Sequence, residues 1–271
     1  MSRCPSINAN LLSWTRAVLK EFKIRPKKSL GQHFLVDGRV LRDYYRLAPR
    51  GLTIIEVGGG LGALTCLLAD IASKLLSVEI DPVLAKIASM VTRGLDNTSI
   101  IVGDGVKHVG SGKAGFLASN LPYNSASQIL VAAAKNNSIQ EVLVVIQEDV
   151  ARKIVAKPGE RNYGRITAFL RYYFDASIEA HYPPSSFYPK PEVAGALLRL
   201  RRIRPWARGD EAFEDLLRCL FSYKNKVLKR AASYCNLPIE GLGDMLSRRV
   251  RDFSPEELYH LSQLSGQSGR G

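Results

Sequence analysis

The chain is poor in cysteine and has no long apolar run. Its 271 residues include only four cysteines, at positions 4, 66, 219 and 235, and no two of them form a Cys-x-x-Cys pair. We therefore expect neither a disulfide framework nor a zinc or other metal site, and a reducing compartment fits this usage best. No apolar stretch reaches the length that crosses a bilayer, so no contact with a membrane is expected.

The first residues also lack the apolar core of a secretory signal. This absence predicts a cytoplasmic protein. Because residues 1–13 contain no acidic side chain, one Arg and three Ser, import into an organelle stays open.

Acidic residues are scarce at both ends of the chain. Residues 1–50 contain 11 Lys/Arg and 3 Asp/Glu (net +8), residues 51–189 contain 12 of each (net 0), and residues 190–271 contain 15 and 10 (net +5). Together they give the formal net charge of +13. A neutral middle between basic flanks predicts that the flanks contact a polyanion such as a nucleic acid.

The middle of the chain alternates between strand and helix patterns. Strands are expected at residues 52–57, 75–80, 99–102, 116–119, 142–147 and 194–200, and helices at 61–72, 82–91, 125–134 and 148–156. Beyond residue 204 the pattern is helical, at 213–223, 227–234 and 255–264. We expect an α/β fold with an open, mostly parallel Rossmann-like sheet and a small C-terminal helical domain.

Glycines and two acidic residues follow successive expected strands. A triple glycine that starts at Gly58 ends the first strand, where a tight turn lets the backbone approach a ligand. Glu79 ends the second strand and can accept both ribose hydroxyls of an adenosine. Asp104 ends the third strand and can accept from an adenine amino group. A dinucleotide fits these features as well as another adenosine cofactor, because Gly58, Gly60 and Ala63 satisfy the relaxed Rossmann fingerprint.

The segment Asn120-Leu121-Pro122-Tyr123 ends the fourth strand. An amide oxygen and a backbone carbonyl can hold the two hydrogens of an exocyclic amine, while an aromatic ring stacks on the base that carries it. Pro122 has no N–H that would compete for these acceptors. Methylation of the amino group of adenine requires this arrangement. Alone, the four residues fit a strand that ends in a Pro-Tyr turn equally well.

Five segments, in this order, resemble the KsgA-type ribosomal RNA adenine N6,N6-dimethyltransferase family. They are Lys28–Leu35 (KSLGQHFL), the glycine turn, Asn120–Asn124 (NLPYN), Tyr163–Arg165 (YGR) and Phe187–Pro191 (FYPKP). The resemblance extends from about residue 20 to residue 260 and includes the basic segment 224–230.

The resemblance implies the sheet of S-adenosylmethionine-dependent methyltransferases, with S-adenosyl-L-methionine as cofactor. Cofactor contacts are implied for Gln32, His33, Leu35, Gly58, Gly60, Glu79, Asp104 and Asn120. Catalytic roles are implied for Asn120, Leu121, Pro122, Tyr123 and Phe187; Tyr123 is expected to stack on one face of the target base and Phe187 on the other. Many relatives have Asn at the position of His33. We expect either the ring or the backbone of His33 to replace the cofactor contact of that Asn.

The implied substrate is a pair of adjacent adenosines in a hairpin near the 3′ end of small-subunit ribosomal RNA, free or within an immature small subunit. Residues 1–35 are expected to form a basic arm that closes over the cofactor, residues 36–204 the catalytic domain, and residues 205–271 a small helical domain that contacts RNA. RNA contacts are expected from Arg25, Lys27, Lys28, Arg165, Lys224, Lys226, Lys229 and Arg230. No self-complementary apolar stripe is evident, so we expect a monomer.

Three other functions fit parts of the sequence. A large-subunit ribosomal RNA adenine methyltransferase of the antibiotic-resistance type shares the cofactor motifs and the Asn120 segment. An RNA-binding assembly or transcription factor could keep the fold without catalysis, although Glu79 and Asp104 then have no use. An NAD-linked dehydrogenase explains neither the Asn-Leu-Pro-Tyr segment nor the basic flanks.

Overall fold

The computed structural model describes residues 4–27 and 31–267 and divides the chain into two compact units. The first unit contains the chain up to Ala151 together with Ser177–Arg201, and the second contains Arg152–Ala176 together with the chain from Arg202 onwards. This division differs from the expected boundaries at two places. The N-terminal arm belongs to the first unit because Leu11, Val18 and Leu19 are buried there, and residues 152–176 belong to the second.

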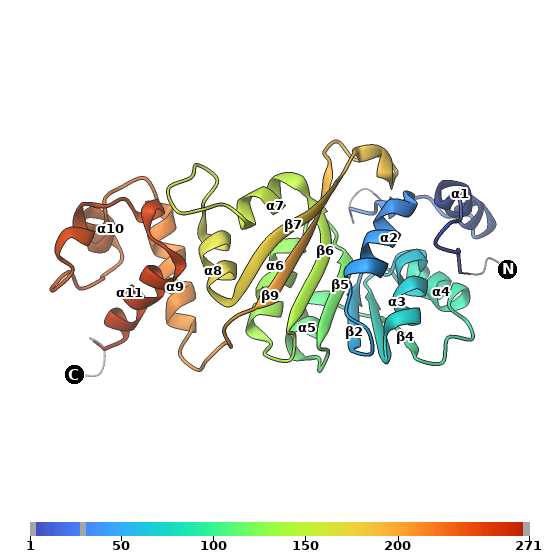
Figure 1. Ribbon diagram of the computed structural model, residues 1–271, viewed down its shortest axis with the longest axis horizontal. Coiled ribbons are helices and arrows are strands. Elements are labelled where there is room, and N and C mark those ends of the chain that lie inside the picture. Colours follow the sequence, from blue (N-terminus) through green and yellow to red (C-terminus); the bar gives the residue numbers. More distant parts are fainter. Residues whose placement is uncertain (1–3, 28–30, 268–271) are drawn as a thin grey trace. The chain divides into compact units, whose positions relative to one another are not determined.

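The core of the first unit is a seven-stranded sheet with the strand order β4-β3-β2-β5-β6-β9-β7 (Figure 1). Strands β2 to β6 pair in parallel, and β9 pairs antiparallel to β6. The strands are β2 (Thr53–Val57), β3 (Lys74–Glu79), β4 (Thr98–Val102), β5 (Phe116–Asn120), β6 (Glu141–Gln147), β7 (Phe174–Tyr182) and β9 (Gly195–Arg202). The expected parallel α/β sheet is therefore confirmed.

Strands β2 and β6 form because their residues are apolar and mostly β-branched, as strands buried on both faces require. Ile54 and Ile55 of β2, and Val142 to Ile146 of β6, have at most 1% of their surface exposed. Helices connect successive strands: α3 (Ala63–Ile71), α4 (Pro82–Val91), α5 (Gly105–Ser111), α6 (Ala126–Lys135) and α7 (Glu148–Ile154). Asp81 caps α4 by accepting from the Val83 N–H at 3.0 Å, with Pro82 at the first helical position.

Two helices and a short strand precede this alternation. They are α1 (Leu11–Glu21), β1 (Phe34–Leu35) and α2 (Gly38–Leu47). Helix α1 begins at Asn10, whose side chain accepts from the Ser13 N–H at 3.0 Å, and its apolar face packs with Phe34, Leu61 and Leu84. Strand β1 pairs antiparallel with β8 (Phe187–Tyr188), which follows the short 3-10 helix η2 (Pro184–Ser186).

All four cysteines form disulfides, so the expectation of no disulfide was wrong. Cys4 is bonded to Cys66 of α3, and Cys219 of α9 (Glu211–Ser222) is bonded to Cys235, the residue after α10 (Leu228–Tyr234). Partners 62 and 16 residues apart have no short sequence pattern that would reveal them. The preference for a reducing compartment, which rested on unpaired cysteines, loses its basis.

The second unit is helical, with α8 (Arg165–Tyr173), α9 (Glu211–Ser222), α10 (Leu228–Tyr234), the short η3 (Gly243–Ser247) and η4 (Val250–Asp252), and α11 (Pro255–Gln267). Its core is aromatic: Tyr172 stacks on Tyr259 with ring centroids 4.2 Å apart, and Phe169 contacts Trp206. The hydroxyls of Tyr173 and Tyr259 both donate to Asp210, at 2.9 and 2.8 Å. These contacts explain why α8 belongs with α9 and α11.

Within the described ranges, no helix combines the length and the apolar character that a membrane crossing requires. Across the same residues, no three His, Cys, Asp or Glu side chains gather as a metal site would need.

Candidate functional site

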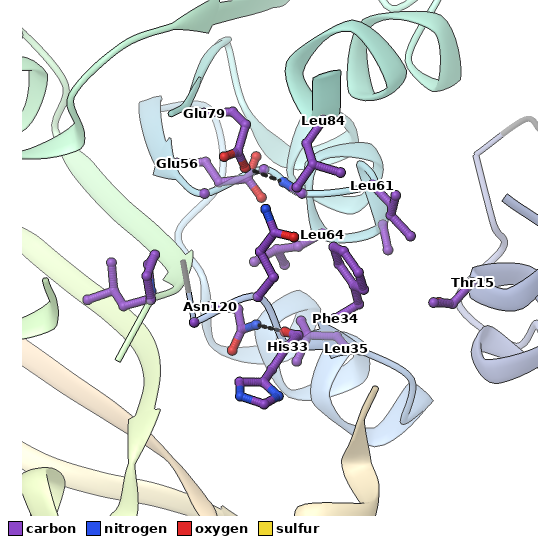
Figure 2. Close-up of a pocket in the computed structure, with 18 of the residues that line it drawn as sticks. Thr15, His33, Phe34, Leu35, Glu56, Leu61, Leu64, Glu79, Leu84 and Asn120 are labelled. Atoms are coloured by element: carbon purple, nitrogen blue, oxygen red, sulfur yellow. Dashed lines mark hydrogen bonds between the residues drawn. The ribbon is translucent and has the colours of Figure 1, made fainter. Parts of the chain in front are cut away.

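A cavity lies at the carboxyl ends of β2, β3 and β5, the edge of a parallel sheet where ligands bind. It is lined by the glycine turn, by Glu56 and Glu79, by Asn120 to Tyr123, and by residues of the N-terminal arm, which are Trp14, Thr15 and Gly31 to Leu35. Figure 2 shows Glu56 and Glu79 close together on one side of this cavity and Asn120 on the facing side.

The glycine turn brings bare backbone to the cavity. Gly58 and Gly60 have φ values of +77° and +57°, a region that favours glycine. A Cβ atom on Gly59 would overlap the Ser77 hydroxyl. The chain can therefore make this turn only with glycine, and Gly58 and Gly60 lie where the sequence predicts.

Glu79 anchors the turn from the end of β3. Its two carboxylate oxygens accept from the backbone N–H groups of Gly60 at 2.9 Å and Asp81 at 3.0 Å. Burial raises the pKa of the carboxyl, and these hydrogen bonds oppose the rise. Each oxygen keeps a second lone pair, so the carboxylate can still accept from two hydroxyls of a ligand.

Glu56 is a second buried carboxyl beside the cavity, and the sequence analysis assigned it no role. It is 1% exposed and accepts from the Thr65 hydroxyl at 2.7 Å. Burial raises its pKa to about 7, and the nearby charge of Glu79 adds to the rise. A single acidic residue within the apolar strand Ile54–Val57 is the sequence signal that could have indicated it.

Asp104 lies in a neighbouring cavity. It caps α5 by accepting from the Val106 N–H at 2.8 Å, and this second cavity shares Gly58, Glu79 and Pro122 with the first. Because Glu79 lines both cavities, it connects the cavity that contains Asn120 to the cavity that contains Asp104. The structure thus brings the expected cofactor residues together along two adjoining cavities.

Asn120 is held at the end of β5 by groups from two other elements. Its Nδ2 donates to the His33 carbonyl at 2.8 Å, which leaves its Oδ1 as an acceptor (Figure 2). Just before it, the buried hydroxyl of Tyr44 donates to the Ser119 carbonyl at 2.6 Å and accepts from the Val145 N–H at 3.0 Å. This hydroxyl lies between the backbones of β5 and β6 at the point where Asn120 leaves the sheet.

Tyr123 lines the same cavity, and Phe187 does not. The Tyr123 ring stacks on His33, with centroids 5.3 Å apart and 30° between the planes. Burial raises the pKa of Tyr123 to about 12. Phe187 is 2% exposed in the hydrophobic core, because it pairs with Leu35 and its ring packs directly over Gly195. Phe187 is therefore a core residue of β8 in this structure, rather than a wall of the cavity.

Two side chains of the N-terminal arm, Gln32 and Lys27, are engaged with Asp81. Lys27 Nζ lies 2.8 Å from Asp81 Oδ2, and Gln32 Nε2 donates to the same oxygen at 3.2 Å. Gln32 Oε1 accepts from the Lys27 N–H at 2.8 Å. Lys27, expected to bind RNA phosphate, instead ties the arm beside the cavity, while Lys28 lies outside the described residues and Arg25 is exposed.

The other expected RNA-binding residues belong to the second unit. Arg165, Lys226, Lys229 and Arg230 are exposed there. Lys224 lines a hollow together with Lys153, Arg161 and Arg251, three cations that the sequence analysis did not select. They were missed because they are far apart in the sequence.

A sheet with this strand order, a glycine turn after its first parallel strand and an acidic residue at the end of the second defines a Rossmann-like α/β fold. Solved structures agree with this fold. A dimethyladenosine transferase from Plasmodium falciparum matches with a TM-score of 0.76 and 21% identity, over 88% of this chain and 98% of that one. The 23S rRNA methyltransferase ErmE matches with a TM-score of 0.63 and 24% identity, over 86% of this chain and 100% of that one.

The sequence model of the family described as "Ribosomal RNA adenine dimethylase" matches residues 23–253. A relative from Pyrobaculum islandicum, "Probable ribosomal RNA small subunit methyltransferase A", is 39% identical over 87% of this chain and 94% of its own length. A protein of the same description from Methanothermobacter thermautotrophicus is 30% identical over 96% of this chain and 100% of its own. The chain belongs to the ribosomal RNA adenine dimethylase family and is a methyltransferase.

Proposed function

We propose that this protein uses S-adenosyl-L-methionine to dimethylate N6 of two adjacent adenosines near the 3′ end of small-subunit ribosomal RNA during ribosome biogenesis. The observation that carries the proposal is the fixed amide of Asn120. Its Nδ2 is bound to the His33 carbonyl, so its Oδ1 is available to a substrate N–H beside the cavity that contains Glu79. The relatives named above as small-subunit ribosomal RNA methyltransferases support the choice of RNA.

The two adjoining cavities fit this cofactor. Glu79 would accept from its ribose hydroxyls, Asp104 from its adenine amine, and the turn at Gly58 and Gly60 would lie against its chain. The arm contributes Thr15, a residue the sequence analysis missed. Its hydroxyl is fully buried at this cavity and, among the described residues, has no hydrogen-bond partner, as expected of a group that awaits a polar ligand.

The adenine amine is a weak nucleophile because its lone pair is delocalised into the ring. Asn120 Oδ1 and the Leu121 carbonyl would accept from its two hydrogens and draw the nitrogen toward tetrahedral geometry, while Tyr123 stacks on the base. When bound, S-adenosyl-L-methionine supplies a methyl group activated by its sulfonium. No strong base is needed, because the nitrogen becomes acidic as it is alkylated, which agrees with an amide at position 120. In the second methyl transfer, the adenine nitrogen already carries one methyl group, so only one N–H is left to donate to these acceptors.

The basic residues of the second unit support an RNA partner. The hollow lined by Lys153, Arg161, Lys224 and Arg251 would hold phosphates. Arg165 and the exposed cations of segment 226–230 are close in the sequence to residues that line it. We propose that the protein acts as a monomer on the RNA or on an immature small subunit.

The test is incubation of the pure protein with labelled cofactor and with small- or large-subunit RNA, followed by mass spectrometry of RNA fragments. We expect two methyl groups on each of two adjacent adenosines of the small-subunit RNA. The Asn120→Ala variant should lose about 100-fold or more of the turnover, a typical cost of removing one polar group that stabilises a transition state. It should keep its RNA affinity, and Asn137→Ala, a change at an exposed loop residue, should keep its activity.

Three outcomes contradict the proposal. Label in large-subunit RNA alone would favour the antibiotic-resistance type. Binding of NAD, but not of S-adenosyl-L-methionine, in calorimetry would favour a dehydrogenase. Unchanged turnover of Asn120→Ala would remove the role of this amide.

A further inference from the structure

The side chain of His33 points away from the part of the cavity that would hold the cofactor. Figure 2 shows its ring turned from Glu79, while its backbone carbonyl accepts from Asn120. Ring atom Nδ1 lies 2.7 Å from the Pro189 carbonyl, which has no hydrogen to give, so Nδ1 is the donor. The imidazole therefore has its own partners, which differ from those of a cofactor ligand.

The two partners of the ring belong to separate segments, and one of them lines the cavity. The imidazole stacks on Tyr123, whose ring lines the cavity. Pro189 directly follows β8, which pairs with β1. His33 thus connects the Asn120–Tyr123 segment to the chain after β8 through its ring, and to the Asn120 amide through its carbonyl.

The hydroxyl of Tyr123 does not anchor the ring through a hydrogen bond: it is buried and, in the part of the chain that the structure describes, has no hydrogen-bond partner. The same part of the chain shows no aromatic ring on Tyr123 other than His33. One face of the phenol ring stacks on the imidazole, so a base that stacks on Tyr123 would use the opposite face.

We propose that the His33 side chain is a positioning residue for the target base: it holds Tyr123 in the orientation in which the face opposite the imidazole stacks on the flipped adenine. The inference rests on the proposed function. An aromatic ring that is fixed before the RNA binds does not have to be ordered when the base leaves its stack, so the base is captured at a lower free-energy cost.

The experiment compares His33→Ala and His33→Phe with the wild type. Cofactor affinity is measured by calorimetry with S-adenosyl-L-methionine, and kcat and KM are measured with a small-subunit RNA hairpin. Loss of one ring contact and one hydrogen bond predicts that His33→Ala lowers kcat/KM for RNA about tenfold or more. The affinity for S-adenosyl-L-methionine should change less than about twofold, because the backbone of residue 33 is kept. His33→Phe keeps a ring on Tyr123 and should recover part of the loss.

The matched control is His181→Ala, because this imidazole is half-exposed and lies beside Glu148 at 3.2 Å. It should match the wild type in every measurement. Circular dichroism and thermal unfolding report whether each variant is folded.

Three results would overturn the inference. A loss of cofactor affinity as large as the loss of kcat/KM in His33→Ala would make the side chain a cofactor ligand. Unchanged kcat/KM in this variant would leave the ring without a role, and a His33→Phe variant as impaired as His33→Ala would exclude stacking as the cause. If the wild type methylates no RNA, the proposed function fails first, and this inference fails with it.

Discussion

At the scale of single residues, the cavity combines groups that a soluble protein rarely buries. Glu56 and Glu79 are both buried carboxyls; burial raises the pKa of Glu56, and the charge of Glu79 adds to the rise. A carboxyl with an elevated pKa favours the protonated form in the folded state. The stability of the first unit should therefore depend on pH through Glu56.

The sign of that dependence follows from the two pKa values. The ordinary value is 4.5 and the folded value is about 7, so the folded state binds the proton more tightly than the unfolded state between them. The contribution of Glu56 to stability is highest below pH 4.5 and falls as the pH rises to about 7. We expect Glu56→Gln, which cannot ionise, to gain about 2–3 kcal/mol relative to the wild type between pH 5 and pH 8. Urea unfolding at several pH values measures it, and a difference that is constant with pH would contradict it.

At the scale of elements, the site depends on a side chain from a helix that the sequence analysis did not expect. Tyr44 of α2 is fully buried, and its hydroxyl connects β5 to β6 just before Asn120. A hydroxyl that satisfies two buried backbone groups is costly to remove.

We expect Tyr44→Phe to lose about 1–3 kcal/mol of stability, because the Ser119 carbonyl and the Val145 N–H lose their partner. The end of β5 should shift, so kcat should fall while the affinity for S-adenosyl-L-methionine is kept. The control is the neighbouring Tyr45→Phe: this ring is 41% exposed and keeps its contact with Arg50 as Phe. Equal stability and equal kcat for the two variants would contradict the prediction.

Elements with a regular pattern could be predicted from the sequence, and those defined by tertiary contacts could not. The expected strand at 142–147 lies at Glu141–Gln147, and the expected helix at 82–91 is α4. Helix α8 was missed because its aromatic residues are buried on a partner helix far along the chain. Strand β7 was missed because it alternates weakly and lies at the edge of the sheet.

The same distinction holds for the site. Motif residues such as Gly60 and Glu79 lie at the cavity, since parallel strands bring their carboxyl ends together. The ion pair of Lys27 with Asp81 and the burial of Phe187 depend on how distant segments pack, which no local pattern encodes.

At the scale of the whole molecule, each unit contains one disulfide. Titration of thiols in denaturant without reductant should find none of the four cysteines free. Replacing Cys4 and Cys66 by Ser, or Cys219 and Cys235 by Ser, should cost about 2–4 kcal/mol in the unit concerned. Calorimetry of the two variants should show that each loss is confined to one unit. Four reactive thiols, or unchanged unfolding in both variants, would contradict this prediction.

The bond between Cys4 and Cys66 also limits how the arm can move. The arm supplies Thr15 to the cavity; it is attached to α3 near its start and enters β1 at Phe34. Because the arm is fixed at both ends, it cannot rotate away from the cavity as a segment with one free end could. Under the proposed function, a cofactor in this cavity would have to leave past an arm that is fixed at both ends, or along the Asp104 side.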